Sequence, residues 1–214
     1  MSDFLDWSTL IYRAPALLIA MALHEYAHAY VSDSLGDPTP SMQGRLTANP
    51  LVHLDMVGLM LLVVCGFGWA KPVEINPNYY KNFRSGVMKV SFAGPGMNLL
   101  SCGVGAFLAN RLPWEGIYLF CGCSAILGFF NLLPALPLDG GVFLRAMLLR
   151  RGELERSDRV LTASSLAVGV LLLCAGTVLF VSSGGNCTLL VCAGAVLGRL
   201  VRNYFTPGRK SFIV

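Results

Sequence analysis

The chain has 214 residues, of which 55% are apolar and only 13% are charged, and its formal net charge is +4. Soluble globular proteins carry roughly 25% charged residues, so this composition excludes an ordinary soluble domain. The excess of basic residues is too small to indicate binding to a nucleic acid, and these residues fall in short segments between apolar stretches, as in the loops of membrane proteins.

The first apolar stretch runs from about residue 9 to residue 30 and lacks the small-residue cleavage site of a signal peptide. We expect it to stay in the protein as a membrane helix. A polar, turn-rich segment separates it from a second apolar run, residues 54–70, which contains three glycines. This second run is marginal as a span, because crossing the hydrocarbon takes about 20 residues.

The remaining apolar stretches are long enough to span a membrane or nearly so, and they lie at residues 90–109, 117–133, 161–181 and 189–200. We predict an all-α polytopic membrane protein with about five to six transmembrane helices. The sequence has no repeat and no room for a separate soluble domain. It is therefore expected to form one membrane-embedded domain over residues 1–214, with a core at 9–150 and additional C-terminal helices at 160–203.

The first helix contains His24-Glu25-Tyr26-Ala27-His28, which matches the HExxH pattern. Residues i and i+4 project from one face of a helix, so the two imidazoles can bind one tetrahedral zinc ion. Glu25 is rotated away from that pair and suits the role of a general base acting on a water bound to the metal. Ionisable groups within a membrane helix usually serve a function. The alternative is a polar cluster at a helix end near the membrane interface.

A catalytic zinc usually takes three protein ligands and a water, so the two histidines need a partner elsewhere. Asp139 is the candidate. It follows Pro134 and Pro137, which should break the helix at this point and leave a gap for water and an extended peptide. Asp139 also suits the position of an N-cap for the helix that follows, and the two roles are compatible.

These segments together resemble the site-2 proteases, a family of intramembrane zinc metalloproteases. The resemblance covers HEYAH at 24–28, FAGPGMN at 92–98 and FNLLPALPLDGG at 130–141, and residues 36–58 resemble the small branch that lacks a PDZ domain. It implies a broken helix at the active site, one zinc ion, ligands His24, His28 and Asp139, and Glu25 as the base. It also suggests that Asn131 holds the substrate backbone or steadies the reacting carbonyl. From residue type alone, Asn131 equally suits capping the carbonyls freed by the helix break.

Three weaker signals surround this site. His53 either orients a ligand, controls water entry or is a structural loop histidine. Asn98 lies in a segment whose glycines favour close helix packing, although its side chain could reach the site. KPVEINPNYY, at residues 71–80, is predicted to be a short extended segment between the HExxH helix and the third apolar stretch, where a substrate strand could pair with it.

If the spans from residue 90 onward alternate, the basic residues from Lys71 onward share one side of the membrane, with Arg111 alone on the other. By the positive-inside rule the first side is cytoplasmic. Ligands on two segments must lie at one depth, so the N-terminus is expected outside and the zinc site near the cytoplasmic face. Both ends of the 54–70 run would then be cytoplasmic, which predicts a re-entrant hairpin.

The expected function is zinc-dependent hydrolysis of peptide bonds within or near transmembrane segments of membrane proteins, in regulated intramembrane proteolysis. The implied setting is the lipid bilayer of a prokaryotic inner membrane, and the partners are transmembrane protein substrates rather than nucleic acid. The alternative is a membrane zinc transporter or sensor, which would use the same ligands without needing Glu25. The sequence leaves the substrate and the oligomeric state open.

Overall fold

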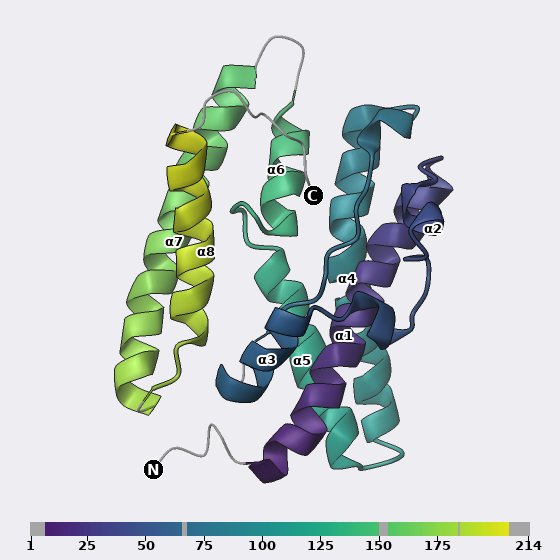
Figure 1. Cartoon of the computed structure of the whole chain (residues 1–214), viewed down its shortest axis with the longest axis vertical. Coiled ribbons are helices and arrows are strands. Elements are labelled where there is room, and N and C mark those ends of the chain that lie inside the picture. The colour runs from purple at the N-terminus through teal and green to yellow at the C-terminus, as the bar shows by residue number, and fades with distance from the viewer. Residues whose placement is uncertain (1–6, 66–67, 150–153, 184, 206–214) are drawn as a thin grey trace.

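The computed structural model describes residues 7–65, 68–149, 154–183 and 185–205, and helices are the dominant structure among them (Figure 1). The α-helices are α1 Trp7–Ser34, α2 Thr39–Met42, α3 Met56–Cys65, α4 Phe83–Ala109, α5 Glu115–Asn131, α6 Asp139–Leu148, α7 Leu154–Ser183 and α8 Thr188–Phe205. Two 3-10 helices are η2 Pro50–His53 and η3 Pro77–Tyr79. The prediction of an all-α fold is confirmed.

Helices α1, α4 and α5 pack against one another and hold the HExxH motif inside the bundle (Figure 1). The start of α4 is fixed by Asn82, whose side chain accepts a hydrogen bond from the backbone N–H of Ser85. Farther along, Gly94, Pro95 and Asn98 of α4 are buried. Small residues such as Gly94 let two helix backbones approach closely, which brings α4 next to the histidines of α1.

The predicted helix break lies between the end of α5 at Asn131 and the start of α6 at Asp139. Its backbone groups find partners within the protein, as membrane-embedded irregular structure requires. The N–H of Leu138 donates to the carbonyl of Ala135, and the N–H of Leu136 donates to Ser165 Oγ of α7 at 3.1 Å. The break therefore places Asp139 at the beginning of a new helix in the protein interior.

Helices α7 and α8 form a hairpin beside the break (Figure 1). It is joined to the rest by an apolar cluster that includes Ala135 of the break together with Leu172, Cys192, Ala193 and Val196. The hairpin thus supports the segment that carries Asp139 but contributes none of the candidate site residues.

The 54–70 run forms a short helix and then returns to its starting point. Helix α3 has 10 residues, so it spans only about half of the roughly 30 Å hydrocarbon core. Leu54 and Ala70 form an isolated antiparallel β-bridge, and the N–H of Lys71 donates to the carbonyl of His53 at 2.8 Å. Both ends of the run therefore lie side by side, as a re-entrant hairpin requires.

Among the described residues, α4 and α7 are the two helices long and apolar enough, by length and composition, to cross a membrane, and α5 is a shorter apolar helix. Helix α1 is 28 residues long, but Arg13, His24, Glu25 and His28 lower its hydropathy. The sequence predicts five to six spanning helices, whereas length and composition identify two among the described residues.

Candidate metal centre

The structure brings together the three residues predicted to bind zinc. His24 Nε2 lies 3.0 Å from Asp139 Oδ2, His28 Nε2 lies 3.4 Å from the same oxygen, and the two Nε2 atoms are 3.1 Å apart. All three residues are buried, with 6%, 4% and 8% of their surfaces exposed. Two segments separated by more than one hundred residues thus converge on one point, as the helix break was expected to allow.

Asp139 does not cap the helix that it begins. It is the first residue of α6, and the N-cap position is occupied by Leu138, which makes no side-chain capping bond. The Asp139 carboxylate is directed to the histidines instead. Of the two roles that the sequence allowed for Asp139, the structure shows the approach to the histidines and not the cap.

Helix α4 contacts the second nitrogen of each imidazole. His28 Nδ1 lies 2.7 Å from the carbonyl oxygen of Val90. A carbonyl only accepts, so Nδ1 carries the hydrogen, and in the neutral ring Nε2 then presents a lone pair toward Asp139. The backbone of α4 therefore selects the tautomer of His28 that can bind a metal.

His24 Nδ1 lies 3.0 Å from the side-chain amide of Asn98, which is fully buried. The amide nitrogen faces the ring, and the amide oxygen Oδ1 is buried without a hydrogen-bond partner. The two ends of an amide are assigned from the hydrogen-bond network. Rotating the amide by a half turn gives Oδ1 a donor, the Nδ1–H of His24, and leaves His24 Nε2 free as an acceptor.

With both imidazoles neutral and protonated at Nδ1, three acceptor atoms converge: two imidazole nitrogens and one carboxylate oxygen, all within 4.8 Å of one another. Such an arrangement is repulsive unless a cation occupies the point of convergence. The donor set of two imidazoles and a carboxylate fits zinc. The convergence of these three atoms thus indicates a metal site.

Glu25 lies next to this group but is not part of it. Its carboxylate oxygen Oε2 accepts a hydrogen bond from the backbone N–H of Val73 at 2.9 Å. Val73 belongs to residues 70–76, which lie outside helices in the region where the sequence predicts a short extended segment. The contact itself was not predicted, because no pattern in the sequence indicates which backbone amide will face a given carboxylate.

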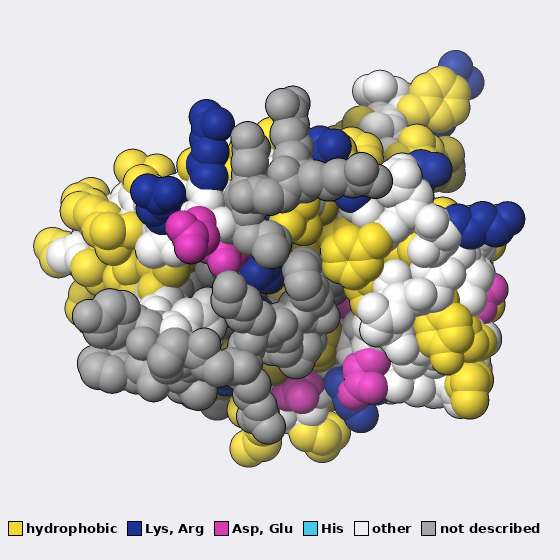
Figure 2. Space-filling model, turned by 90° about the horizontal axis from the view of Figure 1, so that it is seen from above, with side chains coloured by type: hydrophobic (Ala, Val, Ile, Leu, Met, Phe, Trp, Pro, Cys, Tyr) yellow, Lys and Arg dark blue, Asp and Glu magenta, His cyan; other side chains and the backbone are white. Residues whose placement is uncertain are grey.

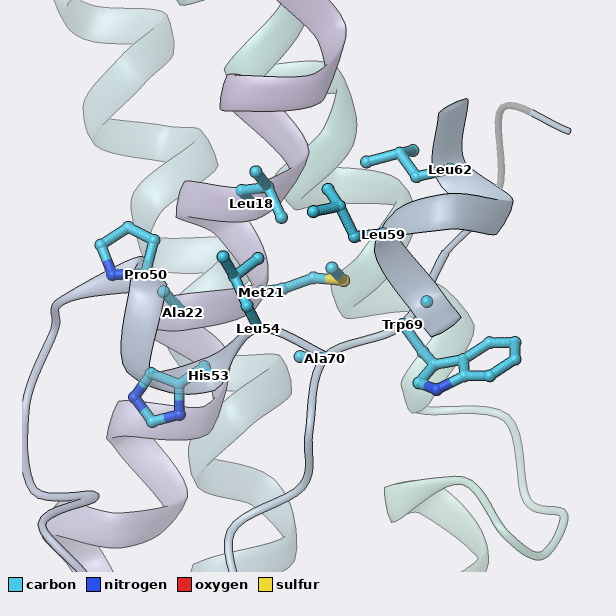
Figure 3. Close-up of a pocket in the computed structure, with 11 residues that line it drawn as sticks. Leu18, Met21, Ala22, Pro50, His53, Leu54, Leu59, Leu62, Trp69 and Ala70 are labelled. Atoms are coloured by element: carbon cyan, nitrogen blue, oxygen red, sulfur yellow. The ribbon is translucent and has the colours of Figure 1, made fainter. Parts of the chain in front are cut away.

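Asn131 and His53 make other contacts in this structure. Asn131 Nδ2 donates to the carbonyl of Leu127, one turn back in α5, at 3.0 Å. His53 is 2% exposed, and its Nε2 lies 2.8 Å from the carbonyl of Thr47. The ring lines a small apolar pocket between α1, η2 and α3 (Figure 3). The hydrogen bonds described for these two residues therefore end on backbone carbonyls rather than on the three converging residues.

A cavity of about 340 Å³ lies between α4, α6 and the helix break. Two of its lining residues adjoin the site in sequence, since Gly140 follows Asp139 and Ser91 follows Val90. The rest of the lining is apolar and consists of Phe92, Leu132, Pro134, Phe143 and Leu144. The cavity therefore suits an apolar side chain.

The chain is similar in sequence and in fold to known zinc metalloproteases. A family model described as peptidase family M50 matches residues 108–175. The chain is 39% identical to YwhC of Bacillus subtilis over 147 residues, covering 62% of this chain and 67% of that protein. It is 25% identical to zinc metalloprotease MJ0392 of Methanocaldococcus jannaschii over 182 residues, covering 80% of this chain and 44% of that protein. A solved site-2 protease from Methanocaldococcus jannaschii has the same fold, with a TM-score of 0.55 and 18% identity over 87% of this chain and 74% of that one.

Proposed function

The chain belongs to peptidase family M50, the site-2 protease family of membrane-embedded zinc metalloproteases, and from this membership we propose that its own site cuts membrane proteins within or near their transmembrane segments. His24, His28 and Asp139 would hold one zinc ion, and Glu25 would act as the general base. The single observation that carries this assignment is the convergence of the three acceptor atoms beside Glu25.

The chemistry divides between the metal and the protein. Zinc supplies the Lewis acid that acidifies a water and polarises the peptide carbonyl. Glu25 takes the proton of that water and returns it to the leaving amine. Since Val73 occupies Oε2 of Glu25, the other carboxylate oxygen remains available for the proton.

Asn98 and Val90 would keep the two histidines in their metal-binding tautomers. Val90 does so through its backbone carbonyl, which no substitution of its side chain removes. Asn98 does so through Oδ1, in the rotated orientation that satisfies this buried oxygen. We assign Asn98 to positioning of His24 rather than to contact with the substrate, because its amide lies against the ring nitrogen and is fully buried.

The substrate must present an extended backbone, because a helix hides its carbonyls in i to i+4 hydrogen bonds. Residues 70–76 lie outside helices beside Glu25, and an unwound substrate could pair along them as a strand. The 340 Å³ cavity would take an apolar substrate side chain next to the cut bond. Asn131 would contact the substrate through Oδ1, since its amide group donates to Leu127. His53 would act at a distance, by fixing the loop before α3.

The proposed setting is a prokaryotic inner membrane, with the zinc site toward the cytoplasm. Five segments would span, namely α1, α4, the broken pair α5 and α6, α7 and α8, while α3 re-enters, and the whole chain would form one embedded domain. The support is the distribution of charge. Lysine and arginine side chains surround the end of the molecule where α4 begins and α6 ends (Figure 2). Arg84 and Arg145 belong to this basic end, whereas Arg111 lies in the turn at the opposite one.

The test is cleavage by purified protein. The native chain, Glu25→Gln and the control Glu74→Gln are purified in detergent, their zinc is measured, and each is given a single-span membrane protein with a helix-breaking residue in its span. We expect zinc in all three and cleavage by the native chain and the Glu74 variant only. Equal cleavage by Glu25→Gln would reject this mechanism. Zinc flux into liposomes without proteolysis would favour the transporter.

A further inference from the structure

Asp37 is a buried carboxylate that lies outside the metal centre and is fully hydrogen-bonded. None of its surface is exposed. Its Oδ1 accepts from the backbone N–H of Thr39 at 3.0 Å and from the Thr39 hydroxyl at 2.6 Å. Its Oδ2 accepts from the hydroxyl of Ser32 at 2.8 Å and from the backbone N–H of Asn76 at 2.7 Å. Four donors from three parts of the chain therefore meet at one carboxylate.

These bonds join the end of α1 to the extended segment 70–76. Ser32 is on α1, two turns beyond Glu25, and Asn76 is at the far end of the segment. Ser32 gives its hydroxyl hydrogen to Asp37, so the Tyr80 hydroxyl donates to Ser32 Oγ, at 2.7 Å. The same carboxylate thus also fixes the chain just after the segment.

The other end of the segment is fixed independently. The N–H of Lys71 donates to the carbonyl of His53, and Ala70 bridges to Leu54. Between the two attachments, Val73 is 3% exposed and its N–H reaches Glu25 Oε2. The segment is therefore held at both ends, with its middle amide directed at the general base.

We propose that Asp37 is a positioning residue for Glu25, acting through Asn76 and Val73. The inference rests on the proposed function, because it assumes that Glu25 is the base. A carboxylate on a flexible side chain needs a fixed partner to hold a productive geometry, and an error of about 1 Å in such a group can cost roughly 100-fold in rate. The N–H of Val73 is that partner, and Asp37 keeps it in place.

The residue type supports this role. Asp37 accepts at both oxygens, which only a carboxylate does, and bonds to an ionised acceptor are stronger than neutral ones. In Asp37→Asn the amide NH2 group would face either Thr39 or the donors Ser32 and Asn76. One of these attachments must then be lost, and a buried donor left without an acceptor is costly.

The main test compares the native chain with Asp37→Asn in detergent. We expect the variant to take up deuterium faster across residues 71–76 and to cleave with a kcat reduced about 10- to 100-fold, while KM and bound zinc stay unchanged. The control is Gln43→Ala, which removes an exposed attachment of the same segment, the bond from Gln43 Nε2 to Glu74 Oε2 at 2.7 Å. It should leave both uptake and kcat unchanged.

If deuterium uptake across residues 71–76 is unchanged in Asp37→Asn, Asp37 does not anchor the segment, whatever the effect on cleavage. Faster uptake with an unchanged kcat would overturn the positioning of Glu25. Failure of the native chain to cut any membrane protein would instead count against the proposed function, while the exchange data still decide whether Asp37 anchors the segment.

A second pair of variants applies if Asp37→Asn does not fold. Val73→Pro removes the amide hydrogen that Glu25 accepts, besides fixing φ and changing the buried side chain, and does not touch the residues that bond to Asp37. Val73→Ala keeps the amide and is its control. A kcat reduced at least tenfold for Val73→Pro relative to Val73→Ala, at equal zinc content, supports the proposal. Equal kcat values for the two variants would overturn it.

Discussion

A β-carbon on Gly94 of α4 would lie 2.6 Å from Nε2 of His24 on α1, far inside van der Waals contact. The same carbon would also press on Nε2 of His28. Both atoms are the ones that present lone pairs toward Asp139. Gly94 is therefore required by the metal centre itself, in addition to helix packing.

Gly94→Ala should abolish zinc binding, because the new methyl group would occupy space that the ligand nitrogens and the metal need. Alanine is a better helix former than glycine, so the helix itself should not suffer. Metal analysis of the purified variant gives the answer. Gly103→Ala is the matched control, since a β-carbon at Gly103 of the same helix meets no atom within 4 Å. Full zinc content in Gly94→Ala would show that α4 can move away from the histidines.

The two orientations of the Asn98 amide predict opposite effects of an aspartate. If Oδ1 accepts from His24 Nδ1–H, then Asn98→Asp keeps an acceptor there and should bind zinc at least as tightly as the native chain. Asn98→Leu has a similar size but no acceptor, and should weaken zinc binding by about 10- to 100-fold. Titration against a competing chelator measures both affinities. Weakening of similar size in the two variants would mean that Asn98 donates to His24 instead.

The parts of the site that the sequence predicts are those set by local spacing. The pair His24 and His28 follows from the helical repeat, and the entry of Asp139 into the interior follows from two prolines that end a helix. Gly94 and Asn98 are also four residues apart on one helix face, so the sequence held a signal for a second helix meeting the histidines. Helix packing was the favoured interpretation, with Asn98 left as a residue that could reach the site, because spacing within α4 does not reveal its register against α1.

The contacts of Glu25 and Asp37 could not be predicted for a different reason. The bond from Val73 to Glu25 and the bond from Asn76 to Asp37 both come from backbone amides of residues 70–76, and a backbone amide carries no side-chain signature. The sequence indicates an extended segment there, but the atom that meets Glu25 is fixed by the lengths of the loops on either side. The number of spanning helices is similarly ambiguous in sequence, because the polar residues that make α1 functional also lower its hydropathy.

Asp37 should make the protein less stable in acid. Burial by itself raises the pKa of this carboxyl, but hydrogen bonds from Thr39, Asn76 and Ser32 outweigh that effect and hold the pKa below its ordinary 3.8. A depressed pKa in the folded state stabilises the fold at pH values above the unfolded pKa. This contribution is lost as the pH falls through the lower, folded pKa.

The melting temperature of the native chain should therefore exceed that of Asp37→Asn by a constant amount above about pH 5, and the difference should shrink below the unfolded pKa. Thermal unfolding in detergent over this range is the measurement. Glu74→Gln, which changes an exposed carboxylate, should show a much smaller dependence on pH. A difference between the native chain and Asp37→Asn that is independent of pH would mean that the charge of Asp37 does not contribute.

The orientation of the site in the membrane can be tested at two exposed positions. Ser41 lies beyond the cytoplasmic end of α1 in the proposed topology, and Leu112 lies in the turn between α4 and α5 at the opposite end. In a background without native cysteines, Ser41→Cys should react with a membrane-impermeant thiol reagent only after the cells are opened, whereas Leu112→Cys should react in intact cells. Labelling of Ser41→Cys in intact cells would mean that α1 crosses the membrane in the opposite direction. It would place the zinc ligands toward the outer face, because His24 and His28 lie in the half of α1 that leads to Ser41.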